Sequence, residues 1–75
     1  MTGINSEFAK TLRKLRTDKN LTQDELAQLS GVDYKYLQKL EGQNPSSPTL
    51  ATMEKLANGL NISLVELVQG IQVKG

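Results

Sequence analysis

Apolar residues recur every three or four positions along most of the chain, which is the spacing that places them on one face of an α-helix. No alternation of apolar and polar residues extends beyond a few positions, so we expect no β-strand. The pattern predicts five short helices in one all-α domain. The expected ranges are about 6–18, 22–30, 33–42, 48–60 and 63–69, with a tail over 70–75.

Residues that favour helix ends support these boundaries. The segments 22–25 and 63–66 match the capping-box pattern, in which a hydroxyl and a carboxylate each accept a hydrogen bond from a free backbone N–H. The other signals are Gly31 after the second helix, Asp33 before the third, and Ser47 with Pro48 at the start of the fourth.

The inward face of each helix predicts the core of a compact bundle. The expected core residues are Phe8, Leu12, Leu15, Leu26, Ala27, Leu29, Val32, Leu37, Leu40, Leu50, Met53, Leu56, Ala57, Leu60, Leu64 and Leu67.

Composition excludes most kinds of catalytic chemistry. The 75-residue chain contains no cysteine and no histidine, so it has no disulfide, none of the usual zinc sites and no Ser–His or Cys–His nucleophile pair. We therefore expect no enzyme, no cofactor, no metal and no small-molecule ligand. A chain this short has a thin core, and self-association is the remaining way to stabilise it.

Two further features bear on location and partners. No apolar run approaches the ~20 residues that span a bilayer, and residues 1–6 do not resemble a signal peptide. We expect a cytoplasmic protein with no membrane partner, associated with the nucleoid if it binds DNA. The net charge is only +1. The cations of the first helix, Lys10, Arg13 and Lys14, are interpreted mainly as a solvated face, with one or two of them near DNA.

The second and third helices carry the most informative spacing. Ala27 is small enough to let two helices cross closely, Gly31 suits a sharp turn, and Val32 follows at once. Leu37 and Leu40 would anchor the third helix and keep its opposite face outward. That face contains the long side chains of Tyr34, Lys35, Gln38 and Lys39, which can reach into a groove.

These positions resemble the Cro/CI-type (XRE family) helix-turn-helix repressors over roughly residues 7–69. The matching segments are 21–27, 30–32, 36–37, 40–41 and 55–57. The resemblance implies a lambda-repressor-like five-helix fold whose third helix lies in the major groove of duplex DNA. A bacterial or phage origin fits this family.

The resemblance also implies roles for individual residues. It assigns base reading to Tyr34, Lys35 and Lys39, with Gln38 nearer the edge of that face. It assigns phosphate contacts to Gln23 and Tyr36, and an ion pair between the first and third helices to Arg16 and Glu41. The loop after the third helix lacks the Lys and Arg of many relatives, so the neutral Asn44 and Ser46 are the expected phosphate donors. Fewer cations predict a shallower dependence of DNA affinity on salt.

Three apolar residues near the end of the chain, Val65, Val68 and Ile71, exceed what one core requires. They predict a homodimer that places two recognition helices about one DNA turn (~34 Å) apart on a pseudo-palindromic operator. The alternative is that the tail packs on the fifth helix.

The predicted function is that of a sequence-specific transcriptional regulator, expected to be a repressor. Two alternatives stay open: a DNA-binding antitoxin or other protein-interaction module, and a small enzyme.

Overall fold

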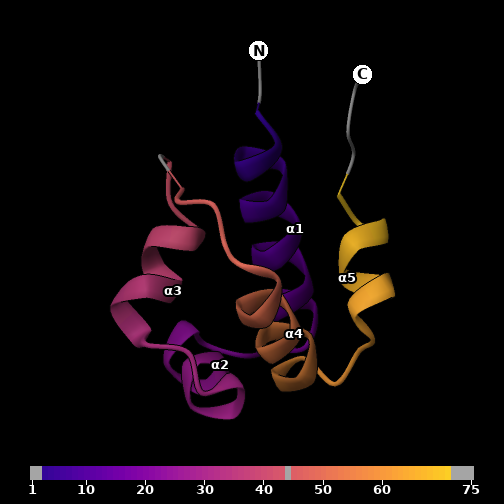
Figure 1. Ribbon diagram of the computed structural model, residues 1–75. Helices are drawn as coiled ribbons and strands as arrows, with labels where there is room; N and C mark the ends of the chain where they lie inside the picture. The colour runs from indigo at the N-terminus through magenta and orange to yellow at the C-terminus, as the bar shows by residue number, and fades with distance from the viewer. Residues whose placement is uncertain (1–2, 44, 72–75) are drawn as a thin grey trace.

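The computed structural model describes residues 3–43 and 45–71, and the helices in these ranges number five. Figure 1 shows α1 and α4 in the middle of the molecule, α2 and α3 on one side and α5 on the other. The all-α fold expected from the apolar spacing is confirmed. The helices are α1 (Ile4–Asp18), α2 (Gln23–Ser30), α3 (Tyr34–Leu40), α4 (Leu50–Gly59) and α5 (Leu64–Gln69).

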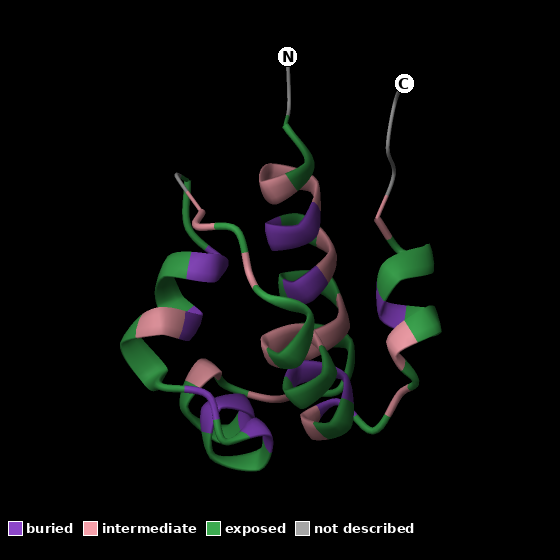
Figure 2. Cartoon of the chain, viewed as in Figure 1, coloured by how far each residue is buried: buried purple, intermediate pink, exposed green. Residues whose placement is uncertain are grey.

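One hydrophobic cluster joins all five helices. Among its members are fully buried leucines from every helix, and Figure 2 shows the buried positions turned toward the inside of the bundle. Partly buried residues such as Leu15, Met53 and Leu64 pack around this cluster. The leucines with no exposed surface are Leu12, Leu26, Leu37, Leu40, Leu56, Leu60 and Leu67.

Capping groups satisfy the first N–H groups of four helices. Both predicted capping boxes form: Thr22 Oγ1 accepts from the Glu25 N–H at 3.0 Å, and Ser63 Oγ accepts from the Glu66 N–H at 3.1 Å. Asp33 caps α3, with its carboxylate accepting from the Tyr36 N–H at 3.1 Å. Local hydrogen bonding therefore explains where these helices begin.

The start of α4 differs from the prediction. Ser47 does not cap it; Thr49 does, because its hydroxyl accepts from the Thr52 N–H at 3.1 Å. Pro48 consequently precedes the helix, and Leu50 becomes its first residue. Leu50 is 74% exposed and not part of the core, because this first turn extends beyond the buried cluster.

Two other helix boundaries and one core residue also depart from expectation. α1 begins at Ile4, because the Gly3 carbonyl already accepts from the Ser6 and Glu7 N–H groups. α3 ends at Leu40, where the Gly42 N–H turns back to the Lys39 carbonyl in a tighter, three-residue step. Leu29 is 61% exposed, whereas its neighbour Ser30 is buried.

The burial of Ser30 comes from the close approach of α2 and α4. A Cβ atom on Gly59 would lie 2.8 Å from the Ser30 Cβ, which is too close for two carbon atoms. Glycine at the end of α4 therefore lets the two helices meet, and the meeting point covers Ser30 and leaves Leu29 in solvent.

Candidate nucleic-acid interface

α2, the turn at Gly31 and α3 form one unit. Gly31 has a φ of 74°, a left-handed conformation that strains residues with a Cβ atom. Ala27 and Val32 are buried on either side of this turn, 6% and 8% exposed. The core of the bundle thus holds the angle between the two helices, and α3 cannot rotate without uncovering Leu37.

The outward face of α3 is polar. Tyr34, Lys35, Gln38 and Lys39 are all exposed, on the side opposite the buried Leu37 and Leu40. The Gln38 amide Nε2 donates to the Tyr34 hydroxyl at 3.1 Å, an i,i+4 pair that was not foreseen. Figure 2 shows this face directed away from the rest of the bundle. The structure thus brings the expected base-reading side chains together on one accessible surface.

A buried ion pair connects α1 to the end of α3. The Arg16 Nε donates to Glu41 Oε2 at 2.8 Å, and the Arg16 Nη2 donates to Glu41 Oε1 at 3.0 Å. The Glu41 side chain is only 2% exposed and that of Arg16 12%. Arg16 also donates to the Leu21 carbonyl at 2.6 Å. This bidentate geometry orients both ends of the pair.

Gln23, the first residue of α2, joins the same cluster. Its amide Nε2 donates to Glu41 Oε1 at 3.1 Å. The sequence spacing gave no sign of this bond, because the two residues come from different helices. It connects the start of α2 to the end of α3 through one carboxylate. The phosphate contact assigned to Gln23 stays a prediction.

Two of the other three expected phosphate contacts are partly buried. Tyr36 and Ser46 are half-buried, and Tyr36 packs against the core. Asn44 lies outside the described residues. The backbone contacts expected of these three residues remain predictions.

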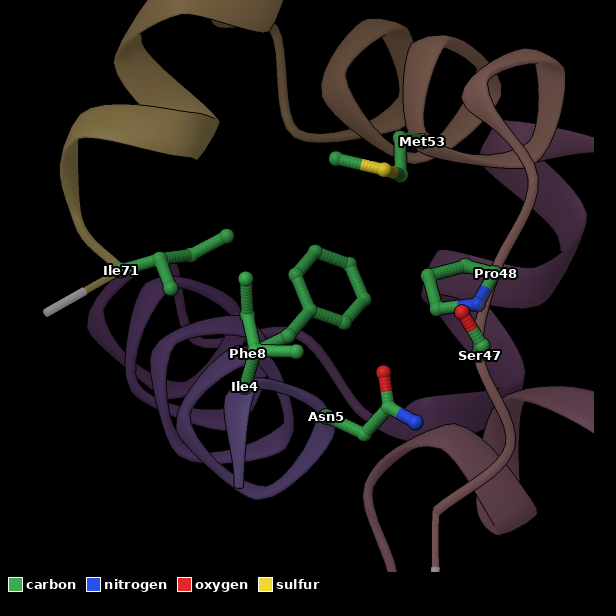
Figure 3. Close-up of a pocket in the computed structure, with 7 residues that line it drawn as sticks. All are labelled: Ile4, Asn5, Phe8, Ser47, Pro48, Met53 and Ile71. Carbon is green, nitrogen blue, oxygen red and sulfur yellow. The ribbon is translucent and has the colours of Figure 1, made fainter. Parts of the chain in front are cut away.

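The residues expected at a dimer interface have different surroundings. Val65 and Val68 on α5 are 62% and 45% exposed. Ile71 instead packs against the core and lines a small depression of about 130 Å³ with Ile4 and Phe8. Figure 3 shows the Ile71 side chain beside Phe8, directed into this depression. Of the three residues expected at the interface, only Val65 and Val68 are therefore exposed.

No group of three or more acidic, histidine or cysteine side chains in residues 3–43 and 45–71 is arranged to hold a metal ion. None of the helices in those ranges has the length and apolar character needed to cross a membrane.

A model of a helix-turn-helix family, HTH_3, matches residues 12–67. The chain belongs to this family. The resemblance to Cro/CI-type regulators is thereby confirmed. An uncharacterised HTH-type transcriptional regulator of Sinorhizobium fredii, y4dJ, is 42% identical over 65 residues, which cover 87% of this chain and 78% of the relative. The control protein C.SmaI of Serratia marcescens is 34% identical over 71 residues, covering 92% of this chain and 83% of its own.

Solved structures agree with these relatives. The restriction-modification controller protein C.AhdI of Aeromonas hydrophila is 40% identical, with a TM-score of 0.78 over 84% of this chain and 94% of its own. The protein C.Esp1396I, solved bound to a 19 base pair DNA duplex, is 28% identical, with a TM-score of 0.80 over 96% of this chain and 100% of its own. The helix-turn-helix described above is thus part of a whole-domain similarity.

Proposed function

We propose that the chain is a sequence-specific regulator of transcription that binds duplex DNA through the outward face of α3. The observation that carries this proposal is the exposure of Tyr34, Lys35, Gln38 and Lys39 on one face of a helix whose other face is fully buried. C.Esp1396I, a relative of matching fold, was solved bound to a 19 base pair DNA duplex, which supports duplex DNA as the partner.

The mechanism is occupancy of an operator. α3 enters the major groove, phosphate contacts set the register, and side chains of α3 read base edges. Lys35 and Lys39 can donate to guanine O6 and N7, so we expect a guanine in each half-site. No bond is made or broken, so no cofactor is required. A protein bound to an operator keeps polymerase away from it, so repression is the expected outcome. The cytoplasm is the expected location of the protein.

The regulator acts as a homodimer in this proposal. Val65 and Val68 lie three positions apart on α5, so they share one helix face, and both are exposed. Pairing these faces around a two-fold axis removes apolar surface from water and presents two copies of α3 to one side of the duplex. The matching operator is pseudo-palindromic, with half-sites about one turn (~34 Å) apart.

Selection of bound duplexes from a random library tests the whole proposal. We expect enrichment of a two-fold symmetric site. Lys39→Ala is then expected to relax preference at one base position per half-site, with a loss of ~1–3 kcal/mol for the preferred base. Lys55→Ala, which removes an exposed lysine of α4 and the same charge, is the control and should leave the preference unchanged.

Two results would contradict this assignment. If no duplex is enriched, the chain does not read DNA sequence. If Lys39→Ala lowers affinity equally for every duplex, Lys39 contacts a phosphate and not a base.

A further inference from the structure

A second depression lies between α1 and the end of α3, with a volume of about 300 Å³. α1 contributes Ser6, Lys10 and Arg13 to its lining, and the segment after α3 contributes Glu41, Gly42 and Gln43. Figure 1 shows the end of α3 next to the first half of α1. Residues far apart in the sequence therefore line one polar hollow on the surface.

Among the described residues, Glu41 supplies the only carboxylate of this lining, and its charge is already neutralised. Both oxygens of Glu41 accept hydrogen bonds from Arg16, and Oε1 accepts another from Gln23. The Glu41 side chain is 2% exposed, so it faces the hollow as one half of an ion pair. Because this ion pair is neutral overall, the net charge of the hollow comes from Lys10 and Arg13.

Those cations are accessible. The Lys10 side chain is 61% exposed, and its contact with Glu7 is a surface pair at 3.5 Å, which holds it weakly. Arg13 is exposed, and its guanidinium has no hydrogen-bond partner among the described residues. Ser6 and Gln43 add a hydroxyl and an amide that can also donate. The hollow thus combines two positive groups with neutral donors, which is the chemistry that holds a phosphate.

Its position relative to α3 identifies the source of that phosphate. Gly42 donates its N–H to the Lys39 carbonyl at 3.2 Å, so the hollow begins directly after the last turn of α3. A duplex that receives α3 in its major groove carries a phosphate strand along each wall of that groove. One strand passes the end of the helix, where Lys10 and Arg13 lie.

We propose that this hollow binds one backbone phosphate of duplex DNA per protomer, beside the groove that α3 enters. The inference rests on the proposed function. Arg13 would hold the phosphate through its guanidinium fork, and Lys10 would add a point charge. α1 thereby supplies positive charge that the loop over 43–47 lacks.

The test compares the full chain with the double variant Lys10→Gln/Arg13→Gln. Affinity is measured across a salt series for the selected operator and for an unrelated duplex. We expect affinity to fall by the same factor for both duplexes, because a phosphate contact carries no sequence information. The slope of log affinity against log salt should become shallower by about 0.9 for each bound protomer.

The matched control is Lys14→Gln/Lys55→Gln, which removes the same charge from exposed residues outside the hollow. It should change the slope less. Lys10→Arg/Arg13→Lys keeps both charges and should retain the slope of the original chain, which separates charge loss from damage to the fold.

Three results would overturn the inference. The first is an unchanged slope in the glutamine variant, and the second is an equal change in the control. The third is a loss confined to the selected operator, which would mean base reading. If the original chain binds neither duplex, the proposed function itself fails, and that outcome is distinct from these three.

Discussion

α2 and α5 begin with the same local device and end in different surroundings. Both start at a capping box, with closely similar hydrogen bonds at Thr22 and Ser63. α2 then buries Leu26, Ala27 and Ser30, whereas α5 buries only Leu67. Val65, the second residue of α5, is 62% exposed. A capping box therefore determines where a helix begins, and the neighbouring helices determine how much of it is covered.

The attachments of the two helices explain the difference. α2 is connected to α3 by the bond between Gln23 and Glu41, and it meets α4 where Gly59 approaches Ser30. α5 packs on the core through Leu67, and beyond its end the Thr11 hydroxyl of α1 donates to the Gly70 carbonyl at 2.9 Å. The helix with attachments on several sides positions α3, and the less covered helix leaves the apolar side chains of Val65 and Val68 exposed.

The largest effect is expected from removing the Glu41 carboxylate at the end of α3, to which Gln23 of α2 is bonded. Glu41→Ala should lower the free energy of unfolding by about 3 kcal/mol, because it leaves the poorly exposed Arg16 without its partner and Gln23 without its acceptor. The midpoint of urea denaturation measures this loss.

The control for Glu41→Ala replaces the whole pair. Arg16→Met/Glu41→Leu should cost no more than about 1 kcal/mol, because apolar side chains of similar size leave no buried charge. If the Glu41→Ala variant unfolds at the same urea concentration as the original chain, the Arg16–Glu41 pair does not hold α1 and α3 together.

A smaller and equal effect is expected at the two capping boxes. Thr22→Ala and Ser63→Ala should each lower the free energy of unfolding by about 1 kcal/mol, because each removes one acceptor from an exposed helix start. Urea denaturation of both variants makes the comparison direct. A much larger loss at Thr22 would show that the start of α2 depends on its tertiary contacts and not on its cap alone.

The smallest change to the fold of one protomer is expected at exposed apolar positions. Val65→Asp should stay within about 0.5 kcal/mol in the stability of the protomer, but it should abolish the dimer by placing charge in the paired faces. Leu29→Asp is the matched control, since Leu29 is 61% exposed on α2 and Val65 62% on α5. Sedimentation of both variants measures the oligomeric state. Dissociation by both, or by neither, would contradict an interface on α5.

Much of the fold could be predicted because its signals act over one helical turn. Apolar spacing placed Leu37 and Leu40 inward, and Gly31 has the left-handed φ that the pattern indicated. The exposed face of α3 follows from the same spacing. Ser47 was the wrong cap for α4 because Thr49, two positions later, can make the same bond, and local pattern does not rank two good caps.

The candidate site divides along the same line. The accessible side chains of α3 could be predicted from the sequence, because helical periodicity places them on the face opposite the buried leucines. The bond between Gln23 and Glu41 and the hollow beside Lys10 and Arg13 were not readable. The bond depends on how α2 and α3 lie against each other, and the hollow depends on how α1 and α3 do. No short segment contains that information.

The chain itself therefore specifies the helix-turn-helix: its starts, its glycine turn and the polarity of its faces arise from backbone hydrogen bonds and spacing within a few residues. Packing adds what local signals cannot reach. The meeting of Gly59 with Ser30, the exposure of Leu50 and the hollow that joins α1 to Gly42 all follow from the way helices cross around one shared core. Interactions between residues close in sequence thus specify the helix-turn-helix. The surfaces proposed for phosphate and for a second copy exist only once the bundle has formed.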